Sequence, residues 1–361
     1  MKKIVTVLGA RPQFVKAAVL SRVISEQGDF QEVIVHTGQH FDANMSAVFF
    51  SEMQIPTPKY NLDINGLSHG AMTGQMLEKI EDVLKIEKPD VVVVYGDTNS
   101  TFAGAMAAKK MQIKVVHIEA GLRSFNMKMP EEINRILTDR ISDLLLCPTD
   151  TAVQNLKDEG FINLENRLVK CGDIMKDAVQ YYSAFSEDKS TVLKNMNLQS
   201  GTFVLATIHR QENTDDIEKL KALFEGLSEI HTTQTVVLPL HPRTQKILEK
   251  YHLEYPIVTC APLGYFDMLE MLKHCSMVVT DSGGLQKEAF FNRKMCIVAR
   301  EQTEWVELVK SGYATLVGSD TKKLIKAFEI FRASSLDFSE NLYGNDVGVR
   351  IHKEIKKLLA E

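Results

Sequence analysis

Cysteine is scarce in this chain, and its few residues form no pattern that a disulfide framework or a metal site would use. They are Cys147, Cys171, Cys260, Cys275 and Cys296, an odd and scattered set among 361 residues. There is no CxxC pair, no histidine–cysteine cluster with zinc spacing, and no other persuasive metal-ligand spacing. We therefore expect buried free thiols in a reducing cytoplasm and predict no bound metal.

The sequence also lacks a long apolar run and a strong excess of charge. No apolar stretch approaches the roughly 20 residues that cross a bilayer. The start, Met1-Lys2-Lys3 and then a short strand, has no apolar segment of a secretion signal. The formal net charge is −5, which favours neither a nucleic-acid partner nor a membrane surface. We expect a cytoplasmic protein with neither partner.

No GxGxxG fingerprint follows the first predicted strand, so we predict no nicotinamide cofactor. The turn there, Gly9–Lys16, reads GARPQFVK. A small-residue turn into a helix still presents free N–H groups to an anion, and Arg11 and Lys16 add positive charge. Alone this is a weak signal, because many strand–helix turns look similar.

What the chain has is a regular alternation of short β-branched runs and helical patterns. This predicts parallel α/β sheets with helices on both faces, and the length suits two domains. We predict two doubly wound Rossmann-like domains facing a cleft, residues 1–172 and 173–345, with a last helix at 346–361 packing back on the first. The predicted strands are Lys3–Leu8, Glu32–His36, Asp90–Tyr95, Lys114–Ile118, Asp143–Cys147, Val204–Ile208, Thr235–Leu240, Pro256–Cys260, Met277–Thr280 and Met295–Val298.

The most informative segment is His117–Arg135, which reads HIEAGLRSFNMKMPEEINR. It begins in a buried strand and ends on a helix start, with Pro130 in the first turn and acids at the positive end of the helix dipole. The loop between them lies where open α/β sheets hold ligands. Glu119 and Glu131 bracket its basic residues, and carboxylates facing each other across a cleft suit proton transfer to and from carbon. A surface ion-pair loop is the alternative.

A second pattern, Asp281–Glu288, reads DSGGLQKE after a strand of the second domain. Ser282, Gly283 and Gly284 offer close backbone approach, a hydroxyl and a helix N-terminus, which suit a diphosphate. Glu288, one turn further, carries a carboxylate that can accept two ribose hydroxyls. A glycine-rich helix entry with Ser282 as the N-cap is the alternative.

Two more strand ends carry titratable side chains. His209 and Arg210 follow the first strand of the second domain. A lone histidine there is more often structural, but a neighbouring arginine favours function. Asp97 follows another strand in a tight turn, and capping the next helix is its alternative role. His241 ends a similar strand, and its role stays open.

Together these residues resemble the non-hydrolysing UDP-N-acetylglucosamine 2-epimerases, which adopt the two-domain GT-B fold. The resemblance spans essentially the whole chain, and its motifs are highly specific in this order. They are Gly9–Pro12 with Lys16, Tyr95–Thr98, His117–Arg123, Pro130–Arg135, His209-Arg210, Thr280–Gln286 and Tyr343-Gly344. The resemblance implies reversible inversion at C2 of a UDP-2-acetamido sugar, no redox cofactor, a homodimer, and a product used in polysaccharide synthesis.

The resemblance also implies a mechanism and residue roles. UDP leaves C1, the C2 proton is lost to give a 2-acetamidoglycal, and protonation from the opposite face with return of UDP gives the epimer. The catalytic candidates are Asp97, Glu119, Glu131 and His209. The substrate-binding candidates are Arg11, Lys16, Arg123, Arg210, Ser282, Gly283, Gly284 and Glu288. Which carboxylate serves which ring face is open, and domain closure over the substrate is expected.

Two departures from the family pattern point to a branch. The Gln-His-Arg segment of the family's allosteric site reads Gln39–Phe41 (QHF) here, so its arginine is absent, and Trp305 stands where an arginine is usual. Both departures resemble the branch that acts on UDP-2,3-diacetamido-2,3-dideoxy-glucuronate in O-antigen pathways. The extra carboxylate of that substrate needs a cation, for which the candidates are Arg123, Lys128, Arg210 and Arg243.

Three other functions are compatible with the fold. A hydrolysing epimerase would release free N-acetylmannosamine and UDP, and a GT-B glycosyltransferase would leave no deuterium at C2. A nucleotide-sugar sensor would bind without exchange. The joint presence of the four catalytic candidates argues against a sensor.

Overall fold

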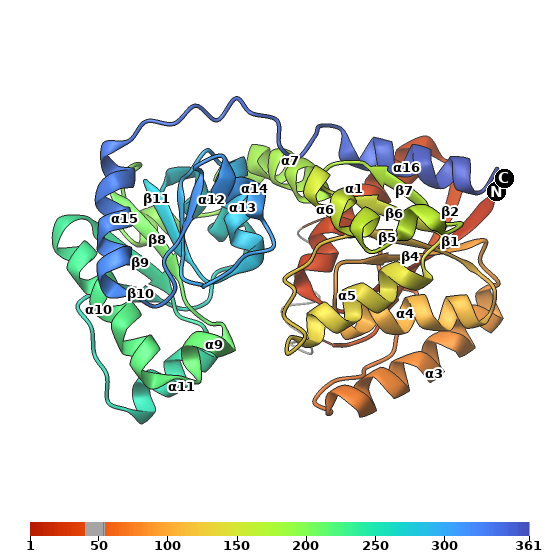
Figure 1. Ribbon diagram of the computed structural model, residues 1–361, viewed down its shortest axis with the longest axis horizontal. Helices are drawn as coiled ribbons and strands as arrows, with labels where there is room; N and C mark the ends of the chain where they lie inside the picture. The colour runs from red at the N-terminus through yellow and green to blue at the C-terminus, as the bar shows by residue number, and fades with distance from the viewer. Residues whose placement is uncertain (40–52, 54, 361) are drawn as a thin grey trace. The chain divides into compact units, whose positions relative to one another are not determined.

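A computed structural model describes residues 1–39, 53 and 55–360 of the chain. The chain forms two compact units (Figure 1). Unit 1 comprises Met1–Ala178 and Asn341–Glu361, and unit 2 comprises Val179–Glu340. The chain passes from the first to the second within helix α7 (Ile174–Lys189). The domain limits expected at residues 172 and 345 stay a prediction of the sequence.

Among its described residues, unit 1 is built on a sheet of seven strands in the order β3-β2-β1-β4-β5-β6-β7. All of its pairings are parallel. The order reverses between β1 and β4, which is where open α/β sheets form ligand sites at the carboxyl ends of their strands. The strands are β1 (Lys2–Leu8), β2 (Phe30–His36), β3 (Tyr60–Asn61), β4 (Val91–Tyr95), β5 (Lys114–Ile118), β6 (Leu144–Cys147) and β7 (Arg167–Lys170).

Helices cover both faces of this sheet (Figure 1). Valines of β1, β2 and β4 form one core with buried side chains of α3 and α4. On the other face α1 packs against α16, where His352 of α16 lies 2.8 Å from the carboxylate of Asp29. The helices are α1 (Arg11–Gln27), α3 (His69–Glu87), α4 (Asn99–Lys110), α5 (Pro130–Ile141), α6 (Asp150–Asp158) and α16 (Val347–Leu358), with a short 3-10 turn at Phe161–Asn163.

Unit 2, all of whose residues are described, is built on six parallel strands in the order β10-β9-β8-β11-β12-β13. These are β8 (Phe203–Thr207), β9 (Thr235–Pro239), β10 (Val258–Cys260), β11 (Met277–Thr280), β12 (Cys296–Val298) and β13 (Ala314–Leu316). The helices are α8 (Val192–Asn195), α9 (Gln211–Thr214), α10 (Ile217–Thr233), α11 (Pro242–Lys250), α12 (Tyr265–His274), α13 (Gly283–Phe291), α14 (Val306–Lys310) and α15 (Thr321–Ala333). A hydrophobic core between the sheet and helices α10 and α15 includes Val204, Leu220 and Phe328.

The prediction of doubly wound parallel α/β domains is confirmed by both sheets. The ten predicted strands are present, within a few residues at their ends. The sequence missed β3, β7 and β13, which are edge strands of two to four residues. None of these three strands contains a run of β-branched residues, and partial exposure dilutes their apolar character.

The lengths of the helices and the state of the cysteines bear on two further expectations. No helix among the described residues is long and apolar enough to cross a membrane. All five cysteines are free, and four of them are buried. Burial raises the pKa of the Cys275 thiol to about 12, so this thiol stays protonated and unreactive at neutral pH.

Candidate active site

The carboxyl ends of β1, β4 and β5 bring Lys16 and Glu119 together. The ammonium of Lys16, on the second turn of α1, donates to the carboxylate of Glu119, and their side chains are only 8% and 11% exposed. Gly96, after β4, lies against this ion pair. A Cβ on it would be 3.3 Å from Oε2 of Glu119 and 3.6 Å from Nζ of Lys16. The pair therefore depends on a glycine at this turn.

Glu119 is held in an uncommon backbone conformation. Its φ is +73°, a region that costs a non-glycine residue about 1–3 kcal/mol. The N–H groups of Glu119 and Ala120 both donate to the carbonyl of Leu146 at 3.1 Å. This shared acceptor fixes the turn, and such conformations concentrate at functional sites.

Asp97 is paired with an arginine that follows it by 38 residues. Arg135 of α5 donates to the carboxylate of Asp97 and, at 2.9 Å, to that of Glu132. Glu132 is fully buried and also accepts from the backbone N–H and hydroxyl of Ser124. Asp97 is therefore a partly exposed carboxylate held by a buried arginine. Thr98, and not Asp97, caps α4, since its side chain accepts from the N–H of Thr101.

Glu131 lies in the first turn of α5 and is half-buried. Among the residues that the structure describes, none donates a hydrogen bond to its side chain. Glu131, Arg135 and Asp139 follow one another at intervals of four on this helix and so share one stripe of its surface. The Glu131 carboxylate, which has no donor among the described residues, thus lies on the same stripe as the arginine that holds Asp97.

Gln13 is a site residue that sequence reasoning did not single out. Its side-chain oxygen accepts from the N–H groups of Gly9 and Ala10 at 2.8 and 2.9 Å. Its amide donates to the carbonyl of Tyr95 and the hydroxyl of Thr101. It therefore ties the turn after β1 to the turn after β4. The only sequence signal was its position within the Gly9–Lys16 turn.

In unit 2, His209 and Arg210 are anchored by a buried aspartate. The carboxylate of Asp281 is fully buried and accepts from the N–H of His209 at 2.9 Å and of Arg210 at 2.9 Å. It also accepts from the side chain of Asn213 at 3.0 Å. Asp281 directly follows β11 and therefore holds the residues that follow β8 in place.

The imidazole of His209 is held in its neutral form. Burial lowers its pKa from the ordinary value of 6.5, the carboxylate of Asp281 partly opposes this, and His241 and Arg210 lower it further. The ring of His241 stacks on that of His209 with centroids 5.4 Å apart. A neutral imidazole can donate from one nitrogen and accept at the other.

The Ser282–Gly284 turn forms the N-terminus of α13 with two arginines beside it. A Cβ on Gly283 would lie 3.8 Å from Nη2 of Arg210 and 3.8 Å from Nη1 of Arg300. Nε of Arg210 is buried and has no hydrogen-bond partner among the described residues. Arg300, which sequence reasoning missed, is paired with Glu304 at 3.0 Å. The turn thus combines a helix N-terminus with an unsatisfied guanidinium donor, a suitable receptor for an anion.

The N-cap alternative for Ser282 is not what the structure shows. Ser282 occupies the N-cap position of α13, but within unit 2 its side chain makes no capping hydrogen bond. Gly284 is exposed, and no atom lies within 4 Å of a Cβ built on it. Glu288 is half-buried further along the same helix, and its ribose role stays a prediction.

Arg123 occupies a different environment from the one expected of a substrate ligand. Its guanidinium is buried and donates to Asp139 at 2.7 Å, to Glu159 at 2.6 and 2.8 Å, and to the carbonyl of Leu122. The side chain of Arg11 and residues 40–52, which include the predicted departure at His40 and Phe41, lie outside the described residues.

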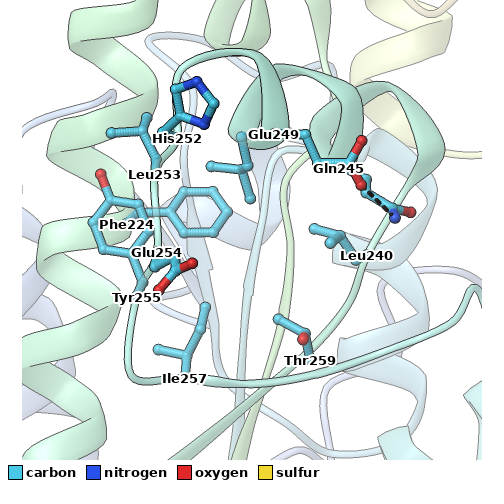
Figure 2. Close-up of a pocket in the computed structure, with 11 residues that line it drawn as sticks. Phe224, Leu240, Gln245, Glu249, His252, Leu253, Glu254, Tyr255, Ile257 and Thr259 are labelled. Atoms are coloured by element: carbon cyan, nitrogen blue, oxygen red, sulfur yellow. Dashed lines mark hydrogen bonds between the residues drawn. The ribbon is translucent and has the colours of Figure 1, made fainter.

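A cavity of about 640 Å³ lies elsewhere in unit 2 (Figure 2). Its lining includes Phe224, Leu240, Tyr255 and Ile257, and none of the predicted site residues takes part. No cluster of three or more potential metal ligands occurs among the described residues.

Comparison with known proteins places the chain in a family. The UDP-N-acetylglucosamine 2-epimerase family matches residues 22–356. The chain is 50% identical over 358 residues to the UDP-2,3-diacetamido-2,3-dideoxy-D-glucuronate 2-epimerase of Pseudomonas aeruginosa, covering 99% of this chain and 100% of that protein. It is 41% identical over 353 residues to a UDP-N-acetylglucosamine 2-epimerase of Methanocaldococcus jannaschii, covering 95% of each.

Solved structures give the same result. The crystal structure of the Methanocaldococcus jannaschii epimerase in complex with UDP-GlcNAc and UDP superposes with a TM-score of 0.90 at 41% identity, covering 99% of this chain and 100% of that one. The UDP-GlcNAc-bound enzyme of Neisseria meningitidis gives 0.87 at 30% identity, covering 98% and 100%. With its two doubly wound sheets of the GT-B type, this chain belongs to the UDP-N-acetylglucosamine 2-epimerase family of isomerases.

Proposed function

We propose that this enzyme inverts C2 of a UDP-2-acetamido sugar by eliminating UDP and adding it back. The observation that carries the proposal is the set of carboxylates at the strand ends of unit 1. Asp97 and Glu119 follow adjacent strands, each held by a cation, and Glu131 opens the helix that supplies the cation for Asp97. Several positioned carboxylates are what proton removal and return at carbon require.

The reaction needs bond breaking before proton transfer. The C2–H of the sugar is not next to a carbonyl, so it becomes acidic only as the C1–oxygen bond breaks and its electron pair leaves with UDP. A carboxylate then takes the C2 proton, and the C–H electrons form the C1=C2 bond of the 2-acetamidoglycal. Protonation of C2 from the other face and attack of UDP on C1 complete the inversion, with no net redox change.

We assign the departing diphosphate to unit 2. The N-terminus of α13 and the donors of Arg210 offer positive charge to an anion, and the neutral imidazole of His209 can donate a hydrogen bond to it. Preorganised donors at a developing anion typically lower a barrier by about 3–4 kcal/mol each. Glu288, on the same helix, is our candidate for binding the ribose hydroxyls. Lys16 and Arg11 are our candidates for the substrate contacts that unit 1 makes.

Within this class we propose the diacetamido-uronate as a second candidate substrate beside UDP-N-acetylglucosamine. Its support is the 50% identity to the Pseudomonas aeruginosa enzyme that bears its name. Of the four cations considered, Arg123 and Arg243 already bond to acids. Arg210 has an unsatisfied nitrogen and Lys128 is exposed, so these two are our candidates for the extra carboxylate.

The test is an isotope experiment in D₂O with each UDP-sugar, followed by NMR of the anomeric and C2 protons. We expect deuterium at C2 and a second UDP-sugar of inverted C2 configuration, with faster turnover of the true substrate. Absence of exchange with both sugars would reject the epimerase proposal in favour of a transferase or sensor. Free N-acetylmannosamine would indicate a hydrolysing enzyme.

We also propose that the protein is a homodimer. The helix α5 exposes Ile133 and Leu137, one turn apart, and the loop before it exposes Phe125 and Met127. Clustered exposed apolar side chains are typical of interaction surfaces. Light scattering should give a dimer that Ile133→Asp with Leu137→Asp converts to a monomer, and a monomeric wild type would contradict the proposal. We also propose a cytoplasmic location, which the scattered free cysteines support, and a role in polysaccharide synthesis, which rests on the resemblance alone.

A further inference from the structure

A buried network of charged side chains lies behind the candidate carboxylates of unit 1. His117 of β5 and Asp139 of α5 are both 0% exposed, and Nδ1 of His117 lies 2.7 Å from Oδ1 of Asp139. The other carboxylate oxygen, Oδ2, accepts from Arg123 at 2.7 Å. Arg123 in turn bonds to Glu159, whose side chain is about one-third exposed. The network therefore runs from solvent into the core.

Two members of this network, His117 and Asp139, form hydrogen bonds to backbone groups within two residues of a candidate catalytic residue. Nε2 of His117 donates to the carbonyl of Gly96 at 2.7 Å, and Asp97 is the next residue. Oδ2 of Asp139 accepts from the N–H of Gly121 at 3.1 Å, two residues after Glu119. The network thus holds both turns that carry a candidate carboxylate.

The third attachment is helix α5 itself. Asp139 is four residues from Arg135, which holds Asp97, and eight from Glu131. Since a helix is rigid over two turns, fixing Asp139 also fixes the place of Glu131 and Arg135. One carboxylate therefore connects the turn of Asp97, the turn of Glu119 and the helix of Glu131.

The network places acids and bases side by side. The two ring nitrogens of His117 face two acceptors, the Gly96 carbonyl and the Asp139 carboxylate. Burial raises the pKa of Asp139, but His117 and Arg123 outweigh this and hold it below the ordinary value. A buried ion network is weak evidence for stability, because apolar residues of similar volume often serve as well. Its hydrogen bonds to the Gly96 carbonyl and the Gly121 N–H, beside two candidate catalytic carboxylates, indicate a role in positioning them.

We propose that His117 and Asp139 are positioning residues that hold the turns of Asp97 and Glu119 and the helix of Glu131 in register for proton transfer at C2. The inference rests on the proposed function. Arg123 completes this brace and does not bind substrate. A displacement of about 1 Å in a catalytic group can lower a rate on the order of 10²-fold, which sets the effect to look for.

The experiment compares His117→Asn, Asp139→Asn and the double variant with wild type. We would measure kcat for C2 exchange in D₂O per UDP-binding site, counting sites by calorimetric titration with UDP. The expected result is a loss of kcat on the order of 10²-fold with UDP affinity within twofold of wild type. Because the two residues act as one unit, the double variant should lose little more than either single variant.

A matched control lies near the amino end of β5. There the carboxylate of Asp143 accepts from the backbone N–H of Val115 at 2.8 Å and from the ammonium of Lys109 at 2.6 Å. Like Asp139, it therefore binds both a backbone N–H of unit 1 and a cation. Asp143→Asn should lower thermal stability without lowering kcat. Glu159→Gln, at the exposed end of the network, should fold and lower kcat by about 2- to 30-fold. If the variants of the buried residues do not bind UDP, the kcat of Glu159→Gln alone tests the positioning role.

The outcomes separate the two proposals. If wild type shows no C2 exchange, the proposed function fails. If wild type exchanges while Glu159→Gln and every variant that binds UDP keep kcat within twofold, the positioning role is wrong. A fall in UDP affinity that accounts for the whole loss of activity would also overturn it.

Discussion

Lys16 of α1 and Glu119 after β5 form an ion pair, although 103 residues separate them in the chain. Both side chains are nearly buried, so neither is a surface charge held by chance. Removing the carboxylate leaves a buried ammonium without its partner. The pair is therefore a point at which the chemistry of unit 1 can be tested.

We expect Glu119→Gln to lower kcat for C2 exchange by about 10²- to 10⁴-fold, because an amide does not accept the proton. UDP affinity should fall much less than kcat, since most of the UDP candidates, among them Arg210 and the Gly283 turn, lie in unit 2. Glu81→Gln is the matched control, because it breaks an exposed pair with Lys85, which contributes little. Wild-type exchange by Glu119→Gln would remove this residue from the mechanism.

Gly96→Ala tests the crowding at the Lys16–Glu119 pair. The new Cβ would lie 3.3 Å from the carboxylate at a φ of +64°, so we expect both lower stability and a lower kcat. Gly28→Ala is the control, because Gly28 has the same φ of +64° and no atom within 4 Å of a Cβ. Both variants should lose about 1 kcal/mol to backbone strain, measured by denaturant unfolding, but only Gly96→Ala should lose activity.

The lowered pKa of His209 predicts a loss of stability in weak acid. The folded state prefers neutral imidazole, so below the ordinary pKa of 6.5 the unfolded chain binds more protons. Stability should therefore fall as the pH drops from about 7 toward 5. His209→Gln should show a smaller fall in Tm over this range. An identical pH dependence in the variant and wild type would show that His209 titrates normally.

Arg210→Met should weaken UDP binding by about 10- to 100-fold, as expected for loss of a charge-assisted hydrogen bond of about 1.5–3 kcal/mol. Its unsatisfied Nε and its place beside Gly283 carry this expectation. Arg332→Met is the control, because Arg332 is exposed and its ion pair with Glu329 is long at 3.8 Å. Calorimetry should separate the two variants, and equal affinities would count against a diphosphate contact for Arg210.

Much of the fold could be predicted because buried parallel strands leave short apolar runs in the sequence. β4 is a run of four valines and a tyrosine, all buried, and its carboxyl end was correctly expected to lead into the Asp97 turn. The edge strands β3 and β13 were missed, because their residues, Tyr-Asn and Ala-Thr-Leu, form no β-branched run. Local pattern thus predicted the strands that contain such a run.

The partners of each site residue could not be predicted, because they come from distant parts of the chain. The sequence by itself determined the two α/β units and the strand ends that carry Asp97 and Glu119. Only the tertiary structure showed Arg135 on Asp97, His117 on the Gly96 carbonyl, and Arg123 engaged by the buried carboxylate of Asp139. The physical reason is that strand periodicity is a local property of the chain, whereas the pairing of a buried charge depends on which strands and helices become neighbours.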